Sequence, residues 1–172
     1  GYDPARMELE FTADQEELRD AVRAVLAKES PITLARSVAE SGARPEALWA
    51  TVTELGWPAL TVPEADGGIG LGMVEAGILA EELGRALAPG PLLPTVTQYV
   101  PAVRACATAQ QRADLLGPVA AGTCAGSLAA LEETGFDPAL TTATVRLDGD
   151  RAVLAGTKRF VMEGDAVDEI VV

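Results

Sequence analysis

The stretch Val62–Ala88, VPEADGGIGLGMVEAGILAEELGRALA, decides how the rest of the chain is interpreted. Its first half is rich in glycine between Gly67 and Gly72, and Pro63 cannot donate a backbone hydrogen bond. From Met73 onward, apolar residues recur at three- and four-residue steps, which is the spacing of an apolar stripe on an α-helix. The stripe consists of Met73, Ala76, Leu79, Ala80, Leu83 and Leu87. The stretch therefore predicts a constrained loop that leads into an amphipathic helix.

The residues before this stretch predict three helices, over about residues 13–29, 33–40 and 45–55. The first begins with a capping box, in which the side chains of Thr12 and Gln15 satisfy backbone N–H groups at the start of the helix. A proline after the first helix and a glycine after each of the other two supply the stops. This part of the chain is therefore expected to be wholly helical.

Two further helices are predicted after the break at residues 89–91, over residues 95–107 and 109–116. Pro101 is expected to kink the first of these or to cut it short, because proline removes a backbone donor and its ring clashes with the preceding turn. The glycine and proline at 117–118 are expected to end the second. With the helices above, they make six helical segments.

The pattern then changes to one typical of strands. Residues 145–147 alternate apolar and polar side chains, residues 148–150 supply a tight turn, and an extended run resumes at 152–154. A second strand is predicted at 160–162, and residues 170–172 begin another. Because a sheet with so few strands is only marginally stable, we expect the chain to be cut inside its second domain, or the sheet to be completed by another polypeptide.

Composition and charge exclude several classes of protein. The chain has 172 residues, of which 48% are apolar and 23% charged, and this balance is ordinary for a globular protein. The net charge of −13 argues against nucleic acid or an anionic membrane surface as a partner. No apolar run approaches the ~18 residues that would predict a membrane span. The chain has no histidine, so it cannot by itself form a Ser-His-Asp triad, a Cys-His pair or a histidine metal site.

The two cysteines, Cys106 and Cys124, are not in a CxxC spacing, and each lies among small apolar residues. Both are expected to be buried free thiols in a reducing compartment, which favours a cytoplasmic protein. The N-terminus lacks the basic and apolar regions of a signal peptide, and Met7 is a candidate for the native first residue.

The glycine loop superficially matches a dinucleotide-binding fingerprint, but the spacing fails. A GxGxxG pattern from Gly68 needs a glycine where Met73 stands, and no βαβ context precedes it. No GxxxxGK[ST] pattern is present either. The loop is therefore interpreted as a structural turn.

Two pairs of adjacent carboxylates, Glu81-Glu82 and Glu132-Glu133, are candidates for acid–base chemistry. Neighbouring residues on a helix do not face each other, so the first pair is interpreted as a solvated face with one flank near Arg85. The second pair follows an apparent strand and is harder to dismiss, although ordinary surface charge is the simpler interpretation. The Lys158-Arg159 pair could hold a phosphate or could lie on an exposed hairpin edge.

The segment VPEADGGIGLGMVEAGILAEELGRALAPGPLLPT resembles the acyl-CoA dehydrogenase family, whose N-terminal domain carries a P-E-x-x-G-G-x-G loop followed by an E-E-L-G-R-type helix. The opening FTADQEELRDAVRAVLAKE resembles the first helix of the family. TAQQRADLLGPVAAGTCAGSLAALEE resembles the last helix of the first domain and the start of the middle β-barrel, and RAVLAGTKRFVMEGDAVDEIVV resembles a G-x-K-x-x-V hairpin with its next strand. The resemblance covers residues 7–172.

The resemblance implies an α+β fold, with an all-α domain of about six helices at 7–122 and the start of an antiparallel β-barrel at 123–172. It implies a FAD cofactor and an acyl-CoA substrate: a glutamate removes the proton α to the thioester carbonyl, and hydride passes from the β carbon to the flavin. An electron-transferring flavoprotein accepts the electrons, and the family forms dimers or tetramers. The catalytic glutamate belongs to a C-terminal bundle that is expected beyond Val172, so the chain as given should be inert.

The resemblance also implies which residues contact FAD. The T-E-P-x-x-G-S-D motif of the family corresponds to residues 130–137, where Phe136 replaces serine and the threonine falls on alanine or leucine. A W-I-T/S motif corresponds to residues 160–162, where Phe160 can still stack but Met162 loses a hydroxyl hydrogen bond worth ~1 kcal/mol net. The implied cofactor residues are Ala130, Leu131, Glu132, Gly135, Phe136, Phe160, Val161 and Met162.

The acyl tail is implied to run against the helix after the proline-rich break, at Leu93, Thr97 and Tyr99. The alternative is that these three residues are core contacts. Three functions stay open: an active acyl-CoA dehydrogenase with a relaxed flavin site, a degenerate subunit of a heteromeric enzyme for bulky substrates such as sterol side chains, and a non-enzymatic scaffold domain.

Overall fold

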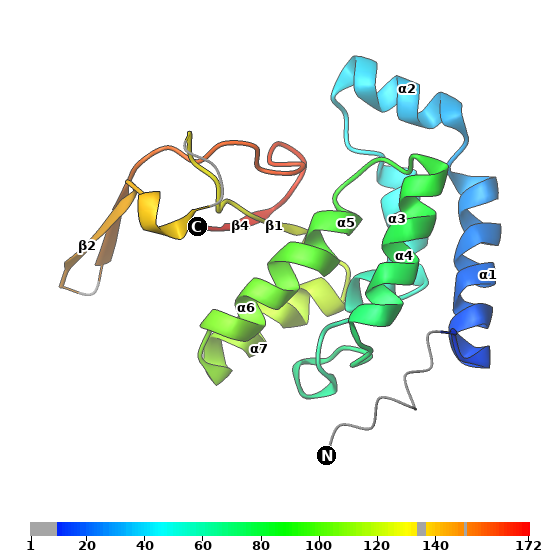
Figure 1. The fold of residues 1–172 in the computed structure, drawn as a ribbon, viewed down its shortest axis with the longest axis horizontal. Helices are drawn as coiled ribbons and strands as arrows, with labels where there is room; N and C mark the ends of the chain where they lie inside the picture. Colours follow the sequence, from blue (N-terminus) through cyan, green and yellow to red (C-terminus); the bar gives the residue numbers. More distant parts are fainter. Residues whose placement is uncertain (1–9, 134–136, 150) are drawn as a thin grey trace.

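The computed structural model describes residues 10–133, 137–149 and 151–172 (Figure 1). The α-helices come first and the strands follow, as the sequence predicts, and a short 3-10 helix, Pro138–Leu140, lies between the first two strands. The helices are α1 (Ala13–Glu29), α2 (Ile32–Ser41), α3 (Glu46–Glu54), α4 (Met73–Ala86), α5 (Leu92–Pro94), α6 (Val100–Cys106) and α7 (Ala109–Ala120). The strands are β1 (Gly126–Leu128), β2 (Thr144–Asp148), β3 (Arg151–Ala155) and β4 (Glu169–Val171). The α+β class is confirmed, and the described strands do not close a barrel.

Helices α1 and α4 lie side by side and run in the same direction (Figure 1). The predicted capping box opens α1: Thr12 Oγ1 accepts from the N–H of Gln15 at 3.2 Å, and Gln15 Oε1 accepts from the N–H of Thr12 at 3.0 Å. Gln15 also donates to Glu75 Oε1 at 2.7 Å, which joins the first turns of the two helices. No helix in the part of the chain that the structure describes is long and apolar enough to cross a membrane.

The helices enclose two apolar clusters. The larger lies between α1, α3, α4 and α5 and includes Val22, Leu26, Leu48, Trp49, Val52, Leu79, Leu83, Leu92 and Val96. The second lies under α6 and α7 and includes Val62, Tyr99, Val100, Val103, Leu116 and Val119. Because both clusters are buried among helices of this chain, the helical part supplies its own hydrophobic core.

The glycine loop is fastened to the residues that precede it. Backbone N–H groups of Ile69 and Gly70 donate to the carbonyls of Ala59 and Val62 at 3.0 and 2.9 Å. A Cβ atom at Gly68 would lie 2.1 Å from the carbonyl oxygen of Val62, so no larger residue fits there. The predicted constrained loop is confirmed, as is the helix that starts at Met73.

The ends of the predicted α4 stripe are exposed. Met73 and Leu87 are 59% and 60% exposed, whereas Ala76, Leu79 and Leu83 between them are buried. Leu87 adopts a left-handed conformation (φ 49°) that ends the helix and turns its side chain away from the core. The stripe is therefore narrower than the sequence predicts.

The prolines interrupt the later helices less than predicted. Thr95–Tyr99 forms a π-helical stretch, in which Val100 donates to Thr95, and this stretch joins α5 to α6 without a break. Pro101 follows in the first turn of α6, where a missing N–H costs least. The predicted end of α7 at 117–118 is wrong: the helix includes Pro118 and continues to Ala120, at the loss of one backbone hydrogen bond.

The strands form two separate pairs. β2 and β3 make the predicted antiparallel hairpin, with Val145 opposite Leu154. β1 lies where the sequence indicates a strand before Glu132-Glu133, but its pairing with β4 is parallel rather than antiparallel, with Gly126 opposite Glu169. The strand predicted at 160–162 is wrong, because Phe160 has a φ of 56°, which lies outside the extended region.

The β2–β3 hairpin lies at the opposite end of the molecule from α1 (Figure 1). Val145, Leu147 and Leu154 share one face of it and are 62%, 77% and 62% exposed. An apolar sheet face with this exposure is what an incomplete sheet leaves uncovered. The exposure agrees with the expectation that more polypeptide completes the sheet.

Of the two cysteines, Cys124 is buried as predicted and Cys106 is exposed. Cys106 is the last residue of α6 and faces away from the second cluster, which includes Val103 and against which Ala107 packs, so its prediction as a buried thiol is wrong. Both are free thiols. Burial raises the pKa of the Cys124 thiol to about 11, so it stays protonated at neutral pH.

Candidate functional site

The first of the two segments that were predicted to contact FAD lies beside Lys158 and Arg159, the two residues directly before the second predicted segment, residues 160–162. The backbone N–H of Arg159 donates to the carbonyl of Leu131 at 2.9 Å, and Lys158 Nζ approaches the carbonyl of Ala130 at 3.5 Å. We call residues 130–132 the first segment and residues 158–162 the second segment. Their backbones are thus bonded to each other, although 26 residues separate them in sequence.

Glu132 is the last residue of the first segment, faces Lys158 of the second segment and is 7% exposed. Its carboxylate accepts from the N–H and the hydroxyl of Thr142 at 2.8 and 2.5 Å, from the N–H of Ala143 at 3.0 Å, and from Lys158 Nζ at 2.9 Å. The Thr142 hydroxyl, then Lys158 and the two backbone donors, lower the pKa of Glu132 to about 2. The group is therefore ionised at neutral pH, with its oxygens fully engaged.

Glu133 and Arg159 form a second ion pair, which is more exposed than that of Glu132 and Lys158. Glu133 contacts Arg159 at 2.5 Å, and the two side chains are 76% and 50% exposed. Glu133 is therefore the surface charge that the sequence predicts, whereas that interpretation is wrong for Glu132. Lys158 and Arg159 each face a carboxylate, and this leaves the phosphate interpretation without support.

A polar depression of about 380 Å³ opens beside these pairs, which is at the small end of ligand-sized pockets. Its lining residues are Glu132, Glu133, Thr142, Gly156, Thr157 and Arg159. Sequence reasoning missed Thr142, because its partner Glu132 is ten residues earlier and no local pattern joins the two.

The second segment continues over the helical part. Phe160 is 81% exposed, Val161 is half-buried, and Met162 is 41% exposed. The Met162 sulfur lies 2.9 Å from Nε2 of Gln98, which belongs to the π-helical stretch. Gly135 and Phe136 lie outside the described residues.

The implied acyl-tail residues are not in one cavity. Thr97 is half-buried, and its hydroxyl donates to the carbonyl of Leu93 at 2.7 Å. Tyr99 is 1% exposed, its hydroxyl donates to Glu169, and its ring covers Gly126, so it is a core contact.

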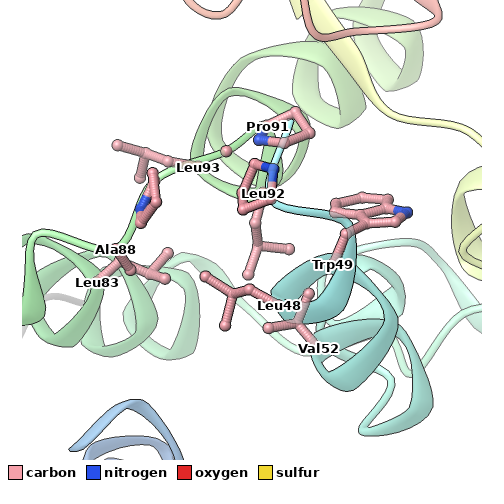
Figure 2. Close-up of a pocket in the computed structure, with 11 residues that line it drawn as sticks. Leu48, Trp49, Val52, Leu83, Ala88, Pro91, Leu92 and Leu93 are labelled. Atoms are coloured by element: carbon pink, nitrogen blue, oxygen red, sulfur yellow. The ribbon is translucent and has the colours of Figure 1, made fainter. Parts of the chain in front are cut away.

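Leu93 instead lines a small apolar cavity between α3, α4 and the turn that precedes α5. Figure 2 shows Leu48, Trp49 and Leu83 directed toward this space. The cavity holds about 20 Å³, which is room for about one water molecule. It is too small, as it stands, for an acyl chain.

Lys158 and Arg159 are paired with Glu132 and Glu133, and the other residues of the two segments fit the face of a flat aromatic ring better than its polar edge. The side chains of Ala130, Leu131, Phe160 and Met162 offer apolar contact area, and none carries an N–H or O–H group. A flavin ring held here would therefore depend on the backbone for hydrogen bonds at its edge.

These features describe a helical domain followed by the first strands of a second domain. A family model for the acyl-CoA dehydrogenase N-terminal domain matches residues 12–123. The chain therefore belongs to the acyl-CoA dehydrogenase family. This confirms the resemblance.

Curated relatives are longer than this chain. Acyl-CoA dehydrogenase IpdE2 of Mycobacterium tuberculosis is 34% identical over 117 residues, which cover 67% of this chain and 36% of that protein. The short-chain specific mitochondrial acyl-CoA dehydrogenase of Bos taurus is 31% identical over 122 residues, which cover 69% and 30%. The aligned part thus spans about a third of each of these relatives.

Two similar solved structures come from assemblies of two named chains. A variant of the Tcur3481-Tcur3483 steroid acyl-CoA dehydrogenase is 33% identical with a TM-score of 0.81, over 91% of this chain and 43% of that one. The ChsE4-ChsE5 complex of Mycobacterium tuberculosis is 31% identical with a TM-score of 0.68, over 88% and 40%.

Proposed function

We propose that this chain is the N-terminal part of an FAD-dependent acyl-CoA dehydrogenase that introduces a double bond between the α and β carbons of an acyl-CoA thioester. The observation that supports this most is that residues 130–132 are bonded to residues 158–159, directly before residues 160–162, which the family resemblance implies as cofactor contacts. When bound, FAD supplies the hydride acceptor for the reaction. Phe160 and Met162 would lie against the ring, and Ala130 and Leu131 would form the facing wall.

The catalytic base of this reaction is proposed to lie outside the chain. Glu132 is the buried carboxylate at the site, but its pKa near 2 and its engaged oxygens make it a poor acceptor for the α proton. The chain spans about a third of its relatives, and the residues given are therefore proposed to be inert by themselves. Glu132 instead holds the residues around it in position.

The proposed partners are acyl-CoA, an electron-transferring flavoprotein, and further copies of this chain or a second dehydrogenase subunit. The exposed apolar face of the β2–β3 hairpin supports coverage by more polypeptide. We keep the division into a helical domain at 7–122 and a barrel domain from 123, and a cytoplasmic location, as proposals.

A second candidate is a degenerate subunit of a heteromeric acyl-CoA dehydrogenase for bulky or sterol-type substrates. Two observations favour it: the first segment and Met162 lack side-chain donors for the flavin, and similar structures include the Tcur3481-Tcur3483 steroid enzyme and the ChsE4-ChsE5 complex. In this candidate the chain supplies packing surface and part of a shared pocket.

Flavin content separates the candidates. The full natural protein is purified alone and after co-expression with a second dehydrogenase subunit, and FAD per chain and dye reduction by acyl-CoA are measured. Stoichiometric FAD and dye reduction in the protein alone support the first candidate and exclude the second. FAD only after co-expression supports the second. No flavin in either preparation contradicts both and leaves a scaffold domain.

A further inference from the structure

One carboxylate joins three parts of the strand region. Glu132 comes from the first segment, Thr142 and Ala143 come directly before β2, and Lys158 follows β3. Since β2 and β3 are the two arms of one hairpin, the carboxylate bonds the open end of that hairpin to the first segment. This group of residues is called the Glu132 clamp.

A tight backbone contact lies at the same place and is independent of the charges. Gly156 has a φ of 152°, and a Cβ atom there would lie 2.6 Å from Cβ of Ala143. The two arms therefore approach each other too closely for a larger residue beside the clamp. The open end of the hairpin is thus held both by backbone proximity and by Glu132.

The clamp sits directly between the residues proposed to face the flavin. Leu131 precedes Glu132 in sequence, and its carbonyl accepts from the N–H of Arg159 at 2.9 Å. Phe160 follows at once, in a left-handed conformation with a φ of 56°. A non-glycine residue keeps such a conformation only where its surroundings hold it, and the bonds at 158 and 159 are the nearest such restraint.

We propose that Glu132 is a positioning residue of the flavin site, whose carboxylate, through Lys158 and Thr142, fixes the spacing between the wall at Ala130–Leu131 and the ring contact at Phe160. This inference rests on the proposed function. It assigns Glu132 a task other than proton transfer, because Glu132 reaches the flavin only through its neighbours.

The positioning role requires the negative charge of the Glu132 carboxylate as well as the shape of its side chain. The Lys158 side chain is 14% exposed and that of Glu132 is 8% exposed, so loss of the carboxylate charge leaves a nearly buried ammonium without its counterion. Lys158 would then turn toward water and carry Arg159 and Phe160 with it. The exposed pair Glu133–Arg159, one residue further along each segment, has the same charges but is screened by solvent, and it provides a matched control.

The test compares E132Q with E133Q in the full natural protein, in whichever form, alone or co-assembled, binds FAD. The readouts are the dissociation constant for FAD and the visible circular dichroism of bound flavin, with far-UV circular dichroism as the check on the helices. E132Q is expected to weaken FAD binding about tenfold or more and to change the visible spectrum, since hydrogen bonds to charged groups are the strong ones. E133Q is expected to stay within about twofold of the wild type.

Two further variants test the same clamp. K158M added to E132Q removes the unpaired ammonium and is expected to recover part of the affinity. T142V removes only the hydroxyl bond and is expected to weaken FAD binding about threefold; it replaces E132Q as the test if that variant does not fold.

The outcomes distinguish this inference from the proposed function. If E132Q, or T142V in its place, matches E133Q in FAD affinity and visible spectrum, the positioning role is wrong while the flavin site stands. If the wild type binds no FAD alone or co-assembled, the proposed function fails and the positioning role fails with it.

Discussion

The helical part of the molecule buries the leucine side chains of its core, whereas the β2–β3 hairpin leaves its leucine side chains exposed. Leu79 of α4 is 0% exposed and Leu26 of α1 is 1% exposed, whereas Leu147 and Leu154 of the hairpin are 77% and 62% exposed. The helices bury their apolar surface against one another, and the hairpin has no layer to cover it. The helical part should therefore carry most of the stability of this chain, and the β2–β3 hairpin should be held to it mainly by polar contacts.

Each part also contains one buried glutamate. Glu82 accepts two hydrogen bonds from Arg23, at 2.6 and 2.9 Å, and joins helices that already pack together. Glu132 instead joins segments that, among the described residues, belong to neither of the two apolar clusters. Substitution of Glu82 should therefore destabilise the whole helical part, whereas substitution of Glu132 should change only the structure around it.

The largest expected effect is in the helical core. Leu79→Ala should lower the free energy of unfolding by roughly 3 kcal/mol, because it removes buried contacts and leaves a cavity between α1 and α4. Leu147→Ala, the same change in the hairpin, should stay within about 0.5 kcal/mol of the wild type. Urea denaturation followed by far-UV circular dichroism measures both. Equal effects would contradict the contrast between the two parts.

A somewhat smaller effect is expected at the buried ion pair of the helical part. Glu82→Gln should cost roughly 2–3 kcal/mol, since it removes the charge partner of Arg23 at a site where Glu82 is 1% exposed. The adjacent exposed Glu81→Gln is the control and should change stability by less than about 0.5 kcal/mol. If both variants denature at the same urea concentration as the wild type, Glu82 contributes no more than surface charge.

The seam between the two parts can be tested at Gly126 of β1. A Cβ atom there would lie 2.3 Å from the ring of Tyr99, so Gly126→Ala should cost about 1–3 kcal/mol by overpacking. Gly77→Ala is the control: a Cβ in that exposed part of α4 meets nothing within 4 Å and should be neutral or slightly stabilising. Thermal unfolding measures both, and a neutral Gly126→Ala would mean that β1 does not pack on Tyr99 as described.

The smallest effect is local and depends on pH. The folded-state pKa of Glu132 is about 2, below its ordinary value of 4.5, so the clamp contributes its full stability above about pH 4.5 and loses it as the pH falls toward 2. Amide exchange of Thr142 and Ala143 should accelerate over this window, and Glu132→Gln should abolish the pH dependence. Exchange that is insensitive to pH beyond its intrinsic chemical rate would contradict the clamp.

Local features were predictable from the sequence. The predicted capping box at Thr12 depends on residues three positions apart and is present, and Thr108 and Gln111 form a second box with the same spacing. The glycine loop and the turn between β2 and β3 likewise follow from the conformations that their own residues permit.

Features that depend on distant partners were not predictable. Glu82 was predicted to be solvated because its partner Arg23 is 59 residues away, and Glu132 was predicted to be surface charge because Lys158 is 26 residues away. The parallel pairing of β1 was not predicted, because its partner β4 lies far away in the sequence. The family resemblance drew attention to the two segments that are proposed to contact FAD, and the structure added Thr142 as a partner of Glu132.

The structure of the full natural protein with FAD added would test the central proposal most directly. If the proposal is right, the flavin ring contacts Phe160 and Met162 on one side and lies near Ala130 and Leu131 on the other. Glu132 then stays bonded to Lys158 behind the ring. A flavin bound wholly by another subunit, with none of these residues in contact, would contradict it.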